Sequence, residues 1–290
     1  MTQTFADRRW TAPDGLSLYA RDYAAASGPA KLPVIAIHGL TRNSADFGAI
    51  APLIAQSGRR VLAIDVRGRG QSDRATDPMT YQPVNYAHDV LALMEQAGIA
   101  RAVFLGTSMG GLITMALAAI RSKVIAAAII NDVGPEVAKE GLARIAAYSG
   151  QPVDTPTWAE AAAYVKSINA VAFPHYTDAD WDAFARRVFR EGPDGPVLDY
   201  DPDIAVPIRA AGQAALVPDL WGDFERLATG RPTLLIRGAT SDLLDAEIAG
   251  RMRARAPEMG YVEVPDVGHA PMLDEPTAEA AILAFLGAVP

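Results

Sequence analysis

The sequence contains no cysteine, which excludes disulfide bonds and thiolate metal sites. It has only four histidines, so any histidine base must be His38, His88, His175 or His269. No apolar run approaches the ~20 residues that a membrane-spanning helix needs. The N-terminal residues also lack the apolar core of a signal peptide. We therefore expect a soluble, cytoplasmic protein that does not bind a membrane.

Basic clusters are also missing, and the formal net charge is −8. This balance argues against nucleic acid as a partner. No histidine and carboxylate spacing resembles H-E-x-x-H, and no G-x-G-x-x-G follows the first strand of a dinucleotide-binding unit. The arginines and glycines of residues 65–73 lack the Lys-Ser/Thr ending of a P-loop, so we interpret them as a structural turn. We expect no metal and no cofactor, a small-molecule substrate as the partner, and leave homo-oligomerisation open.

What is present is a regular alternation of apolar runs and helical segments. Residues 33–39, 61–66, 103–107 and 124–130 form short apolar runs that are typical of strands buried on both faces. Helical segments separate these runs, a hairpin is predicted at Asp14-Gly15, and strands return at 232–238 and 261–264. This order predicts an α/β protein with a mostly parallel eight-stranded sheet that is covered by helices.

The rhythm changes between residues 136 and 217. Helices are expected there at 137–148, 158–172 and 178–191, with several prolines between them and no convincing central strand. We therefore expect residues 136–217 to form an inserted helical cap. Residues 1–135 and 218–290 would form the core.

The stretch from Gly106 to Gly110 reads G-x-S-x-G, with an apolar strand before it and a helix after it. In this setting the pattern is typical of a nucleophile elbow. Glycines are needed because the two backbone segments approach closely, and the turn presents the Ser108 hydroxyl at the edge of the sheet. A serine nucleophile needs a base within hydrogen-bond reach, and that base needs an orienting acid. His269, after the last predicted strand, is the candidate base.

These motifs resemble the α/β-hydrolase superfamily, in particular its cap-bearing esterases, lactonases and carbon–carbon bond hydrolases. The matching stretches are residues 38–40, 65–72, 106–111, 237–242 and 268–271. The resemblance implies the α/β-hydrolase fold and an oxyanion hole formed by the backbone N–H groups of Leu40 and Met109. It also implies that His38 supports the oxyanion loop.

The order Ser, acid, His in this superfamily favours Asp242 as the third member of the triad. Asp132 is the alternative acid, because it also follows a predicted strand and some superfamily members carry the acid at that place. Comparing the turnover of variants at the two positions would decide between them.

The substrate pocket is expected to be lined by large side chains of the cap and its neighbours. His175 could face the substrate or the solvent, and the arginines at 186, 187 and 190 are expected to face water, with one of them a weaker candidate for a substrate carboxylate. The candidates for the pocket wall are Met109, Trp158, Phe173, Tyr176, Trp181, Phe184 and Trp221.

These residues predict a serine hydrolase that cleaves small carboxylic esters or lactones through a Ser108–His269–Asp242 triad and an acyl-enzyme. One alternative is hydrolysis of a carbon–carbon bond in a diketone-type ring-cleavage product with the same triad. An alternative of another class is a non-catalytic receptor on a hydrolase scaffold, which multiple turnover would exclude.

Overall fold

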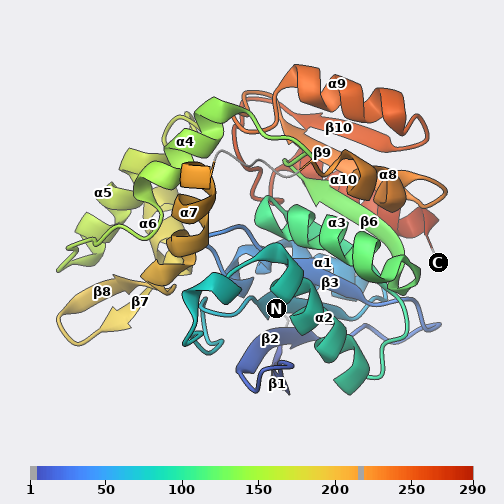
Figure 1. Ribbon diagram of the computed structural model, residues 1–290, viewed down its shortest axis with the longest axis horizontal. Helices are drawn as coiled ribbons and strands as arrows, with labels where there is room; N and C mark the ends of the chain where they lie inside the picture. The colour runs from blue at the N-terminus through green and yellow to red at the C-terminus, as the bar shows by residue number, and fades with distance from the viewer. Residues whose placement is uncertain (1–4, 215–218, 290) are drawn as a thin grey trace.

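A single eight-stranded sheet forms the centre of the computed structural model, which describes residues 5–214 and 219–289 (Figure 1). The strand order is β1-β2-β4-β3-β5-β6-β9-β10. The β1–β2 and β2–β4 pairs are antiparallel and the other five pairs are parallel, which confirms the predicted mostly parallel sheet. The strands are β1 (Ala6–Thr11), β2 (Ser17–Tyr23), β3 (Val34–Ile37), β4 (Val61–Asp65), β5 (Ala102–Thr107), β6 (Ile125–Asn131), β9 (Thr233–Gly238) and β10 (Gly260–Val264).

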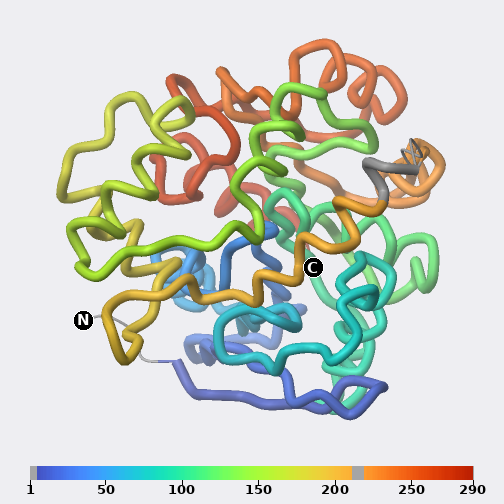
Figure 2. Tube along the Cα trace, turned by 60° about the vertical axis from the view of Figure 1, so that its left-hand side comes forward, coloured from blue at the N-terminus to red at the C-terminus, as the bar shows by residue number. Residues whose placement is uncertain are grey.

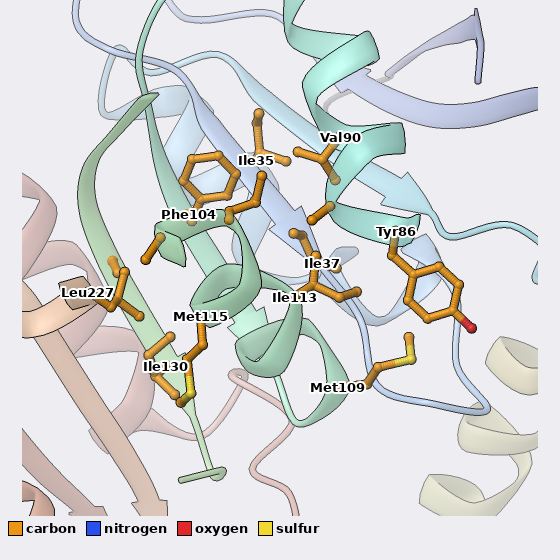
Figure 3. Packing of buried hydrophobic residues seen from close by; sticks show 14 of the residues in the cluster. Ile35, Ile37, Tyr86, Val90, Phe104, Met109, Ile113, Met115, Ile130 and Leu227 are labelled. Atoms are coloured by element: carbon orange, nitrogen blue, oxygen red, sulfur yellow. The ribbon is translucent and has the colours of Figure 1, made fainter. Parts of the chain in front are cut away.

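Helices cover both faces of the sheet, so the central strands are apolar at successive positions. Ile35 and Ile37 pack on one face with α2 and α3 (Figure 3), whereas Val34 and Ala36 pack on the other with α1 and α10. The first face is covered by α2 (Pro83–Gln96), α3 (Met109–Arg121), α8 (Trp221–Ala228) and α9 (Ala246–Arg255), and the second by α1 (Ile50–Gln56) and α10 (Pro276–Ala288). Short 3-10 helices lie at Ser44–Phe47, Pro78–Thr80, Ser122–Val124 and Pro202–Ala205.

The segment expected to be the cap lies to one side of the sheet (Figure 1). It contains α4 (Lys139–Tyr148), α5 (Trp158–Asn169), α6 (Asp178–Val188), the hairpin β7 (Phe189–Gly192) and β8 (Gly195–Leu198), and α7 (Val206–Ala214). The sequence predicts the first three helices, but extends the third to residue 191, where the hairpin has already begun. The Pro193-Asp194-Gly195 turn is the signal for this hairpin. Helix α7 is not predicted, and the expected boundary at 217/218 lies outside the described residues.

The cap contacts loops that follow the carboxyl ends of three parallel strands. After β3, Asn43 Nδ2 donates to the backbone oxygen of Arg187 over 2.8 Å. After β4, the amide of Gly70 donates to the Asp199 oxygen over 2.9 Å. After β10, the amide of Gly268 donates to the Ala172 oxygen over 2.7 Å, so the loop that carries His269 lies beside the cap (Figure 2). These contacts place the described part of the segment beside the sheet edge where ligands of such folds bind.

Within the described ranges, no helix has the length and apolar character to cross a membrane.

Candidate active site

Ser108 occupies a sharp turn between β5 and α3. Its backbone angles are φ 52° and ψ −116°, a conformation that residues other than glycine rarely adopt. A Cβ at Gly106 would lie 2.4 Å from the carbonyl carbon of Gly110, and one at Gly110 would lie 2.1 Å from the backbone oxygen of Ile37. The turn is therefore as tight as the glycine pattern predicts, and it is the strained geometry of a nucleophile elbow.

The imidazole of His269 lies between Ser108 and a carboxylate. The Ser108 Oγ is 2.9 Å from His269 Nε2, and His269 Nδ1 is 2.8 Å from Oδ2 of Asp132. The His269 side chain is 8% exposed and Asp132 is fully buried. With its Nδ1–H donated to a carboxylate, the ring presents an unprotonated Nε2 that can take the serine proton. The structure thus joins the predicted nucleophile and the predicted base.

Three donors hold the carboxylate of Asp132 in place. Its Oδ1 accepts from the Gly238 amide over 2.8 Å, and its Oδ2 accepts from the Ser241 hydroxyl over 2.7 Å as well as from His269. The backbone of Asp132 has φ 58°, in the left-handed region that aspartate and asparagine tolerate better than most side chains. The carboxylate is therefore buried, hydrogen-bonded and fixed toward the imidazole.

The expectation that Asp242 holds His269 is wrong. The carboxylate of Asp242 instead accepts two hydrogen bonds from Arg144 of α4, over 2.6 and 2.8 Å. The loop after β9 presents Ser241 to Asp132 and directs Asp242 toward the cap. Chain order does not distinguish the two aspartates, because β6 and β9 are adjacent in the sheet and each ends near the same edge. The alternative acid, Asp132, has the position that the triad requires.

The pair of Asp242 and Arg144 gives a testable pH dependence of stability. Burial alone would raise the pKa of Asp242, but the hydrogen bonds and charge of Arg144 outweigh it and lower the pKa. A lowered folded-state pKa stabilises the fold above the unfolded pKa of about 4, and this contribution is lost as the pH falls through the lower, folded value. We expect Asp242→Asn to lower Tm by about 1–4 °C at pH 7 and by less at pH 3, measured by calorimetry.

The exposed pair of Asp182 and Arg186 supplies the control, because both side chains are about half exposed. Asp182→Asn should leave Tm within about 1 °C at either pH, since exposed ion pairs contribute little. An equal Tm loss for Asp242→Asn at pH 7 and pH 3 would contradict the assigned ion pair.

The loop after β3 lies against the elbow, since a Cβ on Gly39 would be 3.6 Å from Ser108 Cβ. His38 is fully buried; its Nδ1 donates to the Gly39 oxygen over 2.7 Å and its Nε2 accepts from the Val66 amide over 3.0 Å. Burial lowers the pKa of His38 to about 3, so the ring stays neutral and keeps both bonds. The Gly39 oxygen shares a peptide plane with the Leu40 N–H, so His38 fixes the direction of that N–H.

Arg69 fixes the backbone carbonyl of Leu40, because its Nε donates to the Leu40 oxygen over 2.9 Å. Met109 begins α3, and first-turn N–H groups have no acceptor within their own helix. The geometry therefore favours the predicted support by His38 and leaves Leu40 and Met109 as the proposed oxyanion donors.

A pocket extends from the elbow to the cap, with Ser108 and His269 in its wall. Of the aromatic side chains predicted to line it, Phe173 and Phe184 do so. Three tyrosines and a set of aliphatic side chains that the sequence does not predict also line the pocket. They are Tyr148, Tyr164, Tyr200, Ile145, Val165, Ile168, Val188 and Leu198. The spacing of residues 164, 165 and 168 along α5 is the signal that would have found part of this set, because these positions share one helix face.

The other cap aromatics do not line the pocket. Trp181 is 2% exposed and packs in the cap's own core with Phe184. Tyr176 stacks on Phe173 at a centroid distance of 4.5 Å, behind the pocket wall. Trp158 lies near the cap surface, where its Nε1 donates to Glu191 over 3.1 Å. These large rings are needed to fill the interior of a small helical layer, so aromatic character alone does not indicate a ligand contact.

Two candidates outside the cap are also wrong as pocket walls. Trp221 lies on α8, where the guanidinium of Arg255 sits 4.2 Å from its ring centroid. The Met109 side chain packs in the core near Tyr86, and its sulfur is 3.5 Å from Arg69 Nη2 (Figure 3). His175 is exposed and does not line the pocket.

The three arginines at positions 186, 187 and 190 form ion pairs outside the pocket. The arginine in the pocket wall is instead Arg42, which lies in the loop after β3, two residues beyond Leu40. Its Nε and Nη2 bind the carboxylate of Asp46, and its guanidinium lies 4.0 Å from the ring centroid of Phe184. Among the residues that the structure describes, no group of three or more histidine or acidic side chains is placed to hold a metal ion.

A strained serine at a strand–helix turn, paired with an imidazole and a buried carboxylate at the edge of a parallel sheet, defines an α/β hydrolase. The chain belongs to the alpha/beta hydrolase fold family, which matches residues 33–276, and it is a hydrolase of this type. It is 39% identical over 86% of its length to a 3-hydroxybutyrate-oligomer hydrolase from Cupriavidus necator, of which it also covers 86%.

Two further relatives extend the comparison. A 2-(acetamidomethylene)succinate hydrolase from Mesorhizobium japonicum is 27% identical, with 84% of this chain and 82% of that protein covered. The crystal structure of an alpha/beta hydrolase from Novosphingobium aromaticivorans superposes with a TM-score of 0.91 at 45% identity, covering 99% of both chains. Because this superposition covers 99% of both chains, it includes the segment beside the sheet as well as the sheet itself.

Proposed function

We propose that this protein is a serine hydrolase of short carboxylic esters and that it works through an acyl-enzyme. The observation that carries the proposal is the continuous hydrogen-bonded chain from Ser108 through His269 to the buried Asp132. A serine hydroxyl is a weak nucleophile unless a base within hydrogen-bond reach takes its proton, and the 2.9 Å contact meets that condition.

In the proposed reaction His269 takes the proton of Ser108 as the hydroxyl oxygen attacks the ester carbonyl carbon. The imidazolium that forms is stabilised by the carboxylate of Asp132. The negative charge on the carbonyl oxygen is stabilised by the N–H groups of Leu40 and Met109, each of which typically contributes about 3–4 kcal/mol to lowering the barrier. His269 then gives its proton to the leaving alcohol and activates a water that releases the acid.

The pocket and the relatives together favour esters of short hydroxy acids. A cavity walled mainly by aliphatic and aromatic side chains, with a few hydroxyl groups among them, suits a short carbon chain that carries an oxygen substituent. The 3-hydroxybutyrate-oligomer hydrolase is a relative over 86% of this chain. We therefore propose short hydroxyalkanoate esters as the substrate class, with lactones of the same acids as further candidates.

A fluorophosphonate probe tests the nucleophile directly. We expect one covalent adduct per chain on Ser108, located by peptide mass spectrometry, because the activated hydroxyl attacks phosphorus as it attacks a carbonyl. Ser108→Ala and heat-denatured protein should remain unlabelled. Labelling of Ser108→Ala at the rate of the parent protein would overturn the proposal.

Turnover of p-nitrophenyl butyrate, a small lactone and a diketone then separates ester, lactone and carbon–carbon bond hydrolysis. Multiple turnover of any of them excludes a receptor that only binds.

A further inference from the structure

Tyr164 carries a polar atom that the fold leaves without a partner. Its hydroxyl is buried and makes no hydrogen bond with any described residue. The same residue lines the pocket that contains Ser108 and His269. Nearly all buried polar side-chain atoms in folded proteins are hydrogen-bonded, because an unpaired one costs free energy of folding. Tyr164 lines the pocket and its buried hydroxyl has no partner among the described residues, so a ligand in the pocket is the candidate partner.

The neighbouring tyrosines of the pocket differ from Tyr164. The Tyr148 hydroxyl lies near the side chain of Thr41, and the Tyr200 hydroxyl lies near the backbone of Gly150; burial raises the pKa of both tyrosines, and these polar neighbours partly offset the rise. The neighbour of Tyr148 belongs to the core, whereas the neighbour of Tyr200 belongs to the cap itself. Of these three tyrosines, Tyr164 is the one whose hydroxyl is buried without a hydrogen-bond partner among the described residues.

The Tyr164 hydroxyl is also held in one place and in one protonation state. Its ring packs edge-on against Phe189 at a centroid distance of 6.0 Å and an interplanar angle of 86°. Burial raises the pKa of Tyr164 to about 12, so the group is a neutral phenol over the physiological range. A neutral phenol both donates and accepts a hydrogen bond, which suits an uncharged hydroxyl or carbonyl oxygen.

We propose that the Tyr164 hydroxyl hydrogen-bonds to an oxygen substituent on the acyl chain of the ester, and so selects hydroxyacyl over plain acyl substrates. The inference rests on the proposed serine hydrolase and names the group that recognises its substrate class. Val165, Ile168 and Leu198 supply apolar wall for the carbon chain in the same pocket. A hydroxyacyl chain would satisfy the unpaired hydroxyl, whereas a plain acyl chain would leave it buried and unpaired.

The test compares p-nitrophenyl 3-hydroxybutyrate with p-nitrophenyl butyrate, which differ in one hydroxyl. In Tyr164→Phe we expect kcat/KM for the hydroxy ester to fall about tenfold, as the loss of one neutral hydrogen bond implies, and kcat/KM for the butyrate to change less than twofold. The variant should also gain a few degrees in Tm without ligand, because the unpaired hydroxyl is removed. Deleting a hydroxyl that has only a structural role would not raise Tm.

Tyr176→Phe is the matched control, since it removes a tyrosine hydroxyl from the same cap at a position outside the pocket lining. It should leave the ratio of the two esters unchanged. An unchanged ratio in Tyr164→Phe would overturn the proposal, and so would an equal loss on both esters.

A binding measurement keeps this test independent of catalysis. In a Ser108→Ala background, calorimetry with 3-hydroxybutyrate and with butyrate should show tighter binding of the hydroxy acid. Adding Tyr164→Phe should abolish that difference. If the parent protein hydrolyses neither ester, the proposed function fails, while the calorimetric difference still supports or overturns the role of Tyr164.

Discussion

Asp132→Asn is expected to lower kcat by about 10³–10⁴-fold, while Asp242→Asn keeps kcat within about tenfold of the parent. An asparagine in place of Asp132 would fit the same space and would tolerate the backbone φ of 58°. It lacks the charge that stabilises the imidazolium, however, and its amide can donate to Nδ1, which favours the wrong tautomer of His269. The measurement is steady-state hydrolysis of p-nitrophenyl butyrate, with circular dichroism to verify that each variant is folded.

The two variants form a matched pair, because both replace an aspartate that follows a central strand with the isosteric amide. Asp242 bonds to Arg144 rather than to the imidazole, so its loss should affect cap stability and KM more than kcat. A collapse of kcat in Asp242→Asn, together with near-normal kcat in Asp132→Asn, would contradict the assignment of the acid.

Gly110→Ala is expected to destabilise the protein by about 3 kcal/mol or more and to lower kcat at least about 100-fold. The added Cβ would lie 2.1 Å from the backbone oxygen of Ile37 and 2.8 Å from its carbonyl carbon. Both atoms belong to the end of β3 and cannot rotate away as a side-chain end could. Helix α3 would therefore have to shift, and Ser108 at its N-terminus would move away from His269. Urea unfolding and esterase activity measure the two effects.

Gly250→Ala is the control for this prediction. Gly250 lies within α9, and a Cβ there would meet nothing within 4 Å. Alanine has the higher helix propensity, so this variant should gain about 0.5–1 kcal/mol and keep full activity. Unaltered stability and activity in Gly110→Ala would show that the elbow is looser than its geometry indicates.

In the cap, the sequence predicts where helices form but not which side chains face the pocket. The periodicity of residues 158–172 predicts a helix, and the structure has one over 158–169. The same periodicity does not say whether Tyr164, which lies on this helix, faces a ligand or the cap interior. That choice depends on which neighbouring element packs against the helix, and sequence spacing does not contain that information. Phe173 and Phe184, which the sequence proposes for the pocket wall, lie among the lining residues, whereas Tyr164 is not among the residues that it proposes.

By itself the sequence determined the sheet, its covering helices, and the candidate nucleophile and base, because burial on both faces requires continuous apolar strands and a tight turn requires glycines. Only the tertiary structure decided that Asp132, not Asp242, holds His269. Both aspartates lie in loops that follow neighbouring strands, and a hydrogen bond requires a side chain placed to within a few tenths of an ångström. The positive φ of Asp132 and the reach of Ser241 set that direction, and both arise from packing between segments far apart in the chain.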